Sequence, residues 1–333
     1  MISVMNDIRA FLRRLAVPLC ALLLLVVGMA FPRTERKQRV RVAPGTWPGA
    51  ETLLLANDLN KLPASRFQVI EIPWSSAVMR ALGNGAADVA VVTLDSVLRM
   101  RESGQKLRVL MVLDQSTGGD AVLARAGIQD MQGLRAKTVG VDVRGAGGCL
   151  LIQALEQAGM TMGDIKAVPL IQSEMEQALE LSAVDAVVVS EPWLTRLRQK
   201  GLHSVHDSAQ QQIPILRVLV ASERACAAYR DELMILMKTH VAMTAQIRSG
   251  TPFQGMEMVL RRQKLQTEEF VEALKHWKPL TASENAEMLT GENPKLLQLA
   301  ASMEELMIHR GLLRTKLGTS PWIDPTFFKE AWP

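Results

Sequence analysis

Short runs of apolar, β-branched residues alternate with helix-length amphipathic segments over the first two thirds of the chain. Such runs predict buried strands, and their alternation with helices is typical of parallel sheets joined by crossover helices. The predicted strands are residues 40–43, 67–72, 88–93, 107–113, 138–141, 166–170, 185–189 and, after a polar stretch, 215–221. The first seven are too evenly spread for one small sheet, so we expect two sheets.

Beyond residue 221 the pattern becomes helical throughout. Pro252 and Thr267 indicate two of the helix starts. Earlier in the chain, Ser173 followed three residues later by Glu176 predicts a capping box that opens a helix running through residue 181. The tail "GTSPWIDPTFFKEAWP" holds three prolines and four aromatic residues. We expect this tail to wrap the surface and to pack its aromatic rings.

The first thirty residues have the pattern of an export signal. Arg9, Arg13 and Arg14 precede an uncharged run from about residue 15 to residue 31, and a charged segment follows. Gly28 and Ala30 satisfy the small-x-small rule for cleavage, so we expect the mature chain to begin near residue 31. An uncleaved anchor is the alternative, because about 17 residues at ~1.5 Å rise span roughly 25 Å, near the lower limit for a bilayer.

Composition places the rest of the chain among soluble folded proteins. The 333 residues are 48% hydrophobic and 22% charged, enough for two lobes with separate cores. The net charge is +4, and the leader supplies about half of it, which is too little for a nucleic-acid partner. Cys149 and Cys226 remain outside the leader; we expect buried, unpaired thiols, with a disulfide as the alternative.

The histidines give no sign of a metal site. None of the five belongs to an H-E-x-x-H pair, and His203 and His206 lie in a strand-like segment. We therefore expect neither a metal nor a cofactor.

Polar turns follow the predicted strands, where a ligand crevice would form in an α/β protein. A small oxyanion requires fixed donors such as backbone N–H groups at helix starts, hydroxyls and one basic side chain. After the first three strands, the predicted ligand contacts are Trp47, Pro48, Gly49, Ser75, Ser76 and Thr93. Turn geometry and helix capping explain the same residues without a ligand.

The stretch after the fourth strand falls where the chain would cross between lobes. Gly118 and Gly119 supply the backbone freedom that a hinge or a ligand loop requires. We include Ser116, Gly118, Gly119 and Asp120 among the predicted contacts. A crossover without ligand contact is the alternative.

A glycine cluster follows the strand at 138–141 and opens a helix. Backbone N–H groups exposed by glycines at a helix start, with an arginine beside them, form an anion-binding nest. The predicted contacts in this nest are Arg144, Gly145, Ala146 and Gly147. Cys149 would lie in the first turn of that helix, but no partner base for a nucleophilic thiol is visible.

The last predicted contacts follow the strand at 185–189. Pro192 suits the first turn of a helix, and Glu191 or Trp193 would close over a ligand. Capping and core packing are the alternative roles for these two residues.

Read in order, three stretches of the chain resemble a known family. They are "GAADVAVVTLDS", "KLRVLMVLDQSTGGDAVLA" and "VDAVVVSEPW". The chain from about residue 40 to residue 219 resembles the periplasmic substrate-binding proteins of the nitrate, sulfonate and taurine class of ABC importers, a group that includes thiamine-precursor binders. Two departures leave the ligand open. Ser182 and Ala183 stand where relatives often have glycine, and Arg217 stands where they often have an acidic residue near Leu216.

The resemblance implies an α/β, two-lobed periplasmic binding protein fold of type II. Each lobe would be a parallel or mixed sheet flanked by helices, and the lobes would close about a hinge. The implied division is a leader or anchor at 1–30, the first part of lobe 1 at 31–116, lobe 2 at 117–213, and the return of lobe 1 with the helical end at 214–333.

The implied function is non-enzymatic capture of a small solute in the periplasm. We expect an anionic solute, such as a sulfonate, nitrate or a taurine-like compound, handed by a monomer to an ABC permease of the inner membrane. The alternatives are a membrane-tethered solute sensor and an enzyme on the same scaffold, such as a pyrimidine synthase. The sequence contains no nucleophile elbow, P-loop or paired metal ligands.

Overall fold

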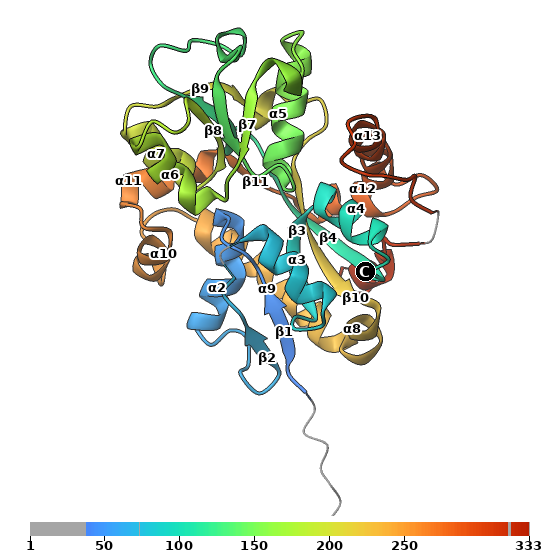
Figure 1. Cartoon of the computed structure of the whole chain (residues 1–333). Helices are drawn as coiled ribbons and strands as arrows, with labels where there is room; N and C mark the ends of the chain where they lie inside the picture. The colour runs from blue at the N-terminus through green and yellow to red at the C-terminus, as the bar shows by residue number, and fades with distance from the viewer. Residues whose placement is uncertain (1–37, 73, 319–320, 333) are drawn as a thin grey trace, which may run out of the picture. The chain divides into compact units, whose positions relative to one another are not determined.

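The computed structural model describes residues 38–72, 74–318 and 321–332. The predicted leader or anchor, with its cleavage point near residue 31, lies outside these residues. The strands form two mixed sheets flanked by helices, which confirms the predicted fold class (Figure 1). In the described part of the chain, no helix is both long and apolar enough to cross a membrane.

The larger sheet has six strands in the order β11-β4-β10-β3-β1-β2. Its strands are β1 (Val40–Ala43), β2 (Phe67–Val69), β3 (Val89–Thr93), β4 (Leu107–Ser116), β10 (Leu216–Ser222) and β11 (Trp277–Pro279). β1 pairs in parallel with β2 and β3, whereas β10 runs antiparallel between β3 and β4. A segment from late in the sequence therefore fills the middle of this sheet.

The smaller sheet has five strands in the order β7-β6-β8-β5-β9. Its strands are β5 (Asp120–Ala124), β6 (Thr138–Val141), β7 (Lys166–Pro169), β8 (Ala186–Ser190) and β9 (His203–Asp207). β5 runs antiparallel to both of its neighbours, as β10 does in the larger sheet, where the edge strand β11 is a second reversed strand. We call residues 39–116 and 216–332 the six-stranded lobe and residues 120–207 the five-stranded lobe.

Three helices accompany the five-stranded lobe, namely α5 (Ala146–Gln157), α6 (Gln172–Glu180) and α7 (Trp193–Gln199). The helices of the six-stranded lobe are α2 (Glu51–Asp58), α3 (Ser75–Gly83), α4 (Leu94–Glu102), α8 (Glu223–Ala228), α9 (Arg230–Arg248), α10 (Met256–Gln263), α11 (Thr267–Lys275), α12 (Ala282–Leu289), α13 (Lys295–His309) and α14 (Pro325–Ala331). The capping box of α6 lies two residues earlier than predicted. Glu174, not Glu176, accepts the backbone N–H of Ile171, because Ser173 already lies inside the helix.

All eight predicted strands occur, with ends shifted by up to a few residues. The predicted strands include none of β5, β9 and β11, although His203 and His206 of β9 were expected in a strand-like segment. β11 interrupts the region expected to be helical throughout. The tail packs its aromatic rings as expected, since Trp322, Phe327 and Phe328 are buried. It also hydrogen-bonds to β4, where Val109 donates to the carbonyl of Trp322 at 2.7 Å.

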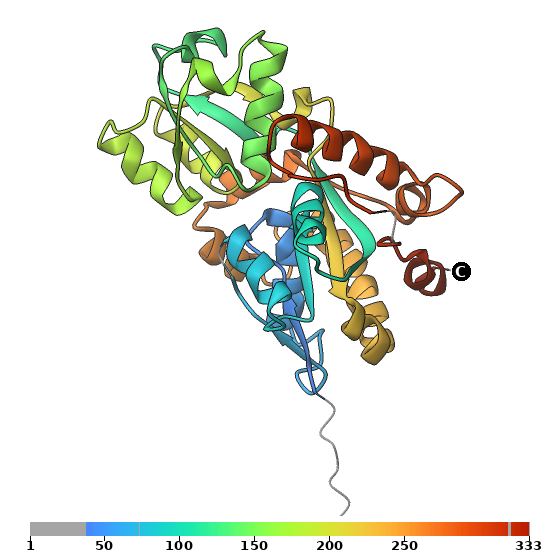
Figure 2. The ribbon, with the colours of Figure 1, turned by 45° about the vertical axis from the view of Figure 1, so that its right-hand side comes forward.

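Each lobe has its own core, and helices of the two lobes contact each other where α5 meets α4 and where α7 meets α11. β5 sends alternate side chains into two separate clusters of the five-stranded lobe, with Val122 in one and Leu123 in the other. Cys149 on α5 instead belongs to the large core of the six-stranded lobe. Figure 2 shows α13 beside α5, where Arg310 at the end of α13 forms an ion pair with Glu156.

Candidate ligand-binding site between the lobes

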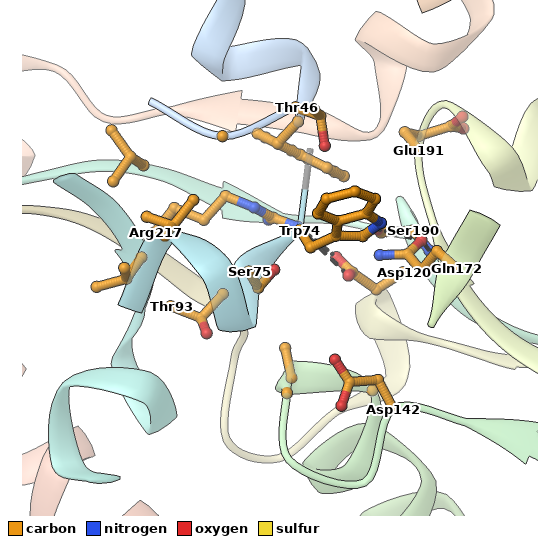
Figure 3. Close-up of a pocket in the computed structure, with 18 of the residues that line it drawn as sticks. Thr46, Trp74, Ser75, Thr93, Asp120, Asp142, Gln172, Ser190, Glu191 and Arg217 are labelled. Carbon is orange, nitrogen blue, oxygen red and sulfur yellow. Dashed lines mark hydrogen bonds and ion pairs between the residues drawn. The ribbon is translucent and has the colours of Figure 1, made fainter. Parts of the chain in front are cut away.

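A cavity of about 100 Å³ lies between the two lobes, at the carboxyl ends of several strands (Figure 3). The six-stranded lobe contributes Pro44, Gly45, Thr46, Trp47, Ile72, Trp74, Ser75, Val78, Val91, Val92, Thr93 and Arg217. The five-stranded lobe contributes Asp120, Asp142, Gly145, Ala146, Gly147, Ile171, Gln172, Val188, Val189, Ser190 and Glu191. This is the position at which open α/β sheets bind ligands.

Arg217 is the central charge of the cavity and is only 6% exposed. Its Nη2 donates to Asp120 Oδ2 at 3.0 Å, and its Nη1 lies 3.6 Å from Asp114 Oδ1. Its guanidinium also stacks on the ring of Trp47, 3.4 Å from the ring centroid. The register of β10 causes this arrangement, because Arg217 pairs with Asp114 on β4 and with Thr93 on β3. The buried guanidinium is thus held by two carboxyl groups and an aromatic face.

Asp114 lies behind Arg217 and is fully enclosed. Burial raises the pKa of its carboxyl group to about 6, although Arg217 and the indole N–H groups of Trp277 and Trp47 act in the opposite direction. A Cβ at Gly49 would overlap Asp114 Oδ2 and lie 2.7 Å from the indole nitrogen of Trp277. Gly49 therefore allows its backbone to lie close to Asp114, and it is outside the lining of the cavity.

The loop that carries Thr46 and Trp47 is supported from α10. Gln263 donates its amide N–H to the carbonyl of Thr46 at 3.3 Å and to Glu51 Oε1 at 2.5 Å. Glu51 also forms an ion pair with Arg262, yet burial raises the pKa of its carboxyl group to about 7. The position of the loop therefore depends on a helix some two hundred residues further along the chain.

The opposite side of the cavity carries two carboxyl groups that are bound by neutral donors. Asp142 Oδ1 accepts the backbone N–H of Arg144 at 3.2 Å. Glu191 accepts the backbone N–H of Thr195 at 3.1 Å and its hydroxyl at 2.9 Å. Burial raises the pKa of Glu191 to about 7, against the lowering effect of the Thr195 donors.

Trp74 and Gln172 border the cavity from opposite lobes (Figure 3). The indole of Trp74 is 43% exposed, and its N–H donates to the hydroxyl of Ser173 at 3.4 Å. This hydrogen bond joins α3 to α6 across the opening. Gln172 Oε1 accepts the backbone N–H of Ser190 at 2.9 Å and its hydroxyl at 3.0 Å.

The structure brings half of the predicted contacts together around the cavity. Those that line it are Trp47, Ser75, Thr93, Asp120, Gly145, Ala146, Gly147 and Glu191. Those outside its lining are Pro48, Gly49, Ser76, Ser116, Gly118, Gly119, Arg144 and Trp193.

Among the crossover residues, Asp120 lines the cavity, whereas Ser116 and Gly118 contact the returning chain. Ser208 Oγ lies 2.8 Å from Ser116 Oγ and accepts the backbone N–H of Gly118 at 2.8 Å. Gly118 has φ +101°, which confirms that this position needs the freedom of glycine. A Cβ at Gly119 would meet the ring of Trp47, so this glycine serves packing.

Arg144 and Trp193 also depart from their predicted positions. The side chain of Arg144 is exposed and does not reach the cavity, because only its backbone N–H turns toward Asp142. Trp193 packs against the core of the five-stranded lobe, with the guanidinium of Arg196 5.3 Å from its ring centroid. The arginine of the predicted anion nest is therefore missing from the site.

Sequence reasoning missed several side chains of the lining: Thr46, Trp74, Asp142, Gln172, Ser190 and Arg217. Arg217 gave a usable signal, since it is the one charged residue in an otherwise apolar strand and departs from the family pattern. Asp142 lies between the strand predicted at 138–141 and the glycine cluster, and a carboxylate at this position disfavours the binding of an anion there.

Neither cysteine lies in the lining of the cavity. Both described cysteines are free thiols, and burial raises the pKa of Cys226 to about 12 and that of Cys149 still further above its ordinary value. Within residues 38–72, 74–318 and 321–332, no group of three or more His, Cys, Asp or Glu side chains is placed to hold a metal ion.

The fold is that of two-lobed periplasmic binding proteins. The chain superposes on the alkanesulfonate-binding protein SsuA from Xanthomonas axonopodis pv. citri with a TM-score of 0.72 and 16% identity, over 86% of this chain and 98% of that one. A ligand-binding component of an ABC-type import system from Staphylococcus aureus gives a TM-score of 0.71 and 13% identity, over 88% and 99%. The desulfurization enzyme DSZB gives 0.62 and 14%, over 88% and 99%.

The sequence itself identifies the family. The family described as "NMT1/THI5 like" matches residues 68–244, more than half of the chain. The protein therefore belongs to the NMT1/THI5-like family. No curated protein matches the sequence.

Proposed function

We propose that this protein is the extracytoplasmic solute-binding component of an ABC importer. The observation that carries the proposal is the cavity, which draws its polar side chains from both lobes and is bridged at its opening by Trp74 and Ser173. A solute bound there would contact both lobes at once and so stabilise their closed arrangement.

The family and the fold support this proposal. The superposed structures include a ligand-binding component of an ABC-type import system and an alkanesulfonate-binding protein. The arginine-rich, apolar leader pattern of residues 1–30 fits a chain exported to the periplasm, and an inner-membrane permease would then receive the solute. Residue contacts to the solute would come from the cavity lining.

An enzyme on this scaffold is the second candidate, since the desulfurization enzyme DSZB shares the fold. Binding is favoured over catalysis by the side chains available here. The lining holds no cysteine, and its serine and threonine residues have no histidine beside them among the lining residues. Serine and threonine nucleophiles are most often activated by an adjacent histidine.

The proposal is tested by identifying what the protein retains. Purified mature protein is mixed with a small-molecule extract, separated from free solutes and unfolded, and the released compounds are identified by mass spectrometry. We expect one compound at close to one equivalent, which raises the melting temperature when added back. A ligand at a hundred times its Kd adds roughly 2.7 kcal/mol. Finding no retained compound and no stabilisation would overturn the proposal, and turnover of that compound would favour an enzyme.

A further inference from the structure

The charges that line the cavity are predominantly negative. Asp120, Asp142 and Glu191 contribute three carboxyl groups, whereas Arg217 is the one basic side chain in the described lining. The lining therefore carries a net charge of −1 when Glu191 is protonated and −2 when it is ionised. An anion entering this space would meet more repulsion than attraction.

Arg217 is also poorly placed to bind an anion. Its Nη2 already donates to both oxygens of Asp120, at 3.3 and 3.0 Å, and Asp114 lies 3.6 Å from its Nη1. Its flat face rests on Trp47. To bind a sulfonate or nitrate, this guanidinium would have to leave two buried carboxylates without a partner, which is costly.

The helix start that was expected to form an anion nest contains a carboxylate of its own. Asp142 Oδ2 would lie 3.1 Å from a Cβ at Gly145, directly beside the first turn of α5. The backbone N–H of Arg144, next in the chain, already donates to Asp142 Oδ1. The positive end of the α5 dipole is thus offset by a fixed negative charge.

We propose that the solute presents a positively charged group, or a planar group rich in N–H donors, to these carboxyl groups. This inference rests on the proposed function and names its class of solute. Neither Asp142 nor Glu191 forms an ion pair within the described residues. Asp142 can accept a further hydrogen bond from the solute, whereas Glu191, whose two oxygens both accept from Thr195, contributes negative charge to the same side of the cavity. The half-exposed indole of Trp74 offers a flat face, and such a face attracts cations and stacks with planar groups.

Three probes of the same shape and different charge test the inference: benzamidinium, benzamide and benzoate, with ethanesulfonate and nitrate as further anions. Binding to the mature protein is measured by calorimetry and by tryptophan fluorescence. We expect benzamidinium to bind at least tenfold more tightly than benzoate, and neither ethanesulfonate nor nitrate to bind measurably.

The variant Asp142→Asn tests whether the preference for benzamidinium over benzoate arises in the cavity. Asparagine keeps an oxygen for the backbone N–H of Arg144 but removes the charge, so we expect the tenfold preference to shrink several-fold. Asp130→Asn is the matched control, because Asp130 also accepts a backbone N–H, from Gly133 at 2.9 Å, in the same lobe outside the cavity. If Asp142→Asn does not fold, Glu191→Gln replaces it.

The outcomes separate the inference from the proposed function. Tighter binding of any anion, no binding of any probe, or an unchanged preference in Asp142→Asn overturns the inference. A retained compound that proves to be an anion also overturns it while leaving the solute-binding function intact. The absence of any retained compound counts against the function itself.

Discussion

The two sides of the cavity solve the problem of buried charge in different ways. On the β10 side, a guanidinium lies between two carboxyl groups, so charge is matched within the protein. On the side of α5 and α7, Asp142 and Glu191 accept hydrogen bonds from backbone N–H groups and a hydroxyl, and neither forms an ion pair with a basic side chain of the described residues. The first arrangement supports the fold without a ligand. The second leaves capacity that a solute can use, and the following predictions test this contrast.

The largest effect is expected on the matched side. Arg217→Met removes the cation from Asp114 and Asp120, which are both buried. Breaking a buried ion pair by removing one partner costs about 3–5 kcal/mol. We expect a loss of this size in the free energy of unfolding, measured by urea denaturation.

Arg144→Met serves as its control, because that side chain is exposed and outside the cavity. It should change stability by less than about 0.5 kcal/mol. Similar losses in the two variants would contradict the role assigned to Arg217. The double variant Arg217→Met with Asp120→Asn should recover part of the loss, since one unpaired charge is removed.

The unmatched side predicts a dependence of stability on pH. Burial raises the pKa of Glu191 from its ordinary value of 4.5 to about 7, so the folded protein keeps a proton that the unfolded chain releases. Stability must then fall as pH rises from about 4.5 to about 7. Glu191→Gln should remove on the order of 2–3 kcal/mol of this fall, as measured by denaturation across that range.

The charged groups near Glu191 change the size of the expected fall in stability but not its direction. Asp120 raises its pKa further, and Arg198 lowers it. Asp114 and Glu51 have raised pKa values as well and should keep a shallower slope in the variant. Glu268→Gln, at an exposed position on α11, should leave the slope unchanged. If stability fell equally with pH in the native protein and in Glu191→Gln, the carboxyl group of Glu191 would not be the source of the pH dependence.

Closure can be followed through Cys149, which is 1% exposed where α5 packs against the core of the six-stranded lobe. A thiol reagent can reach it when the lobes separate. We expect a saturating solute to slow its labelling at least tenfold, measured by mass spectrometry. Cys226 on α8 is partly exposed and serves as the internal reference, with an unchanged rate. A solute that binds without slowing Cys149 labelling would argue against closure at this contact.

The smallest effect is expected at the surface contact between lobes. Arg310 and Glu156 are each about one third exposed, and pairs of this kind contribute roughly 1 kcal/mol or less. Arg310→Ala should raise the Cys149 labelling rate by no more than about fivefold. Arg230→Ala breaks a similar exposed pair, with Glu330, inside one lobe and should not change that rate. Equal acceleration by both variants would exclude a role for Arg310 in holding the lobes together.

Much of the fold could be predicted because buried strands leave a local pattern. Runs such as Val89–Thr93 are apolar on both faces, and each predicted run became a strand. β11 has only three residues, and β5 follows β4 after three residues, so neither stands apart in the pattern. Their place is decided by pairing with β4 and β8, partners that the sequence does not reveal.

The candidate site was less predictable because it depends on the direction of side chains. Gly145, Ala146 and Gly147 line the cavity as expected, but their neighbour Arg144 points to solvent. Arg217 enters the site through long-range register, since β10 pairs with β3 and β4 about a hundred residues earlier. This strand pairing brings the positive charge of Arg217 into the cavity. It could not be predicted by examining, one after another, the turns that follow each predicted strand.

The two crossings between the lobes lie side by side. Ser116, at the end of β4, contacts the returning chain directly. Its backbone N–H donates to the carbonyl of Ile215 at 3.0 Å, and its hydroxyl contacts the hydroxyl of Ser208. Residues 117–214 thus leave and re-enter the six-stranded lobe at one point, like a module inserted into a host domain. A short turn from Ser116 to Leu216 would join β4 and β10 as a hairpin, but it would also remove Asp120 and leave Arg217 without one of its two carboxyl partners.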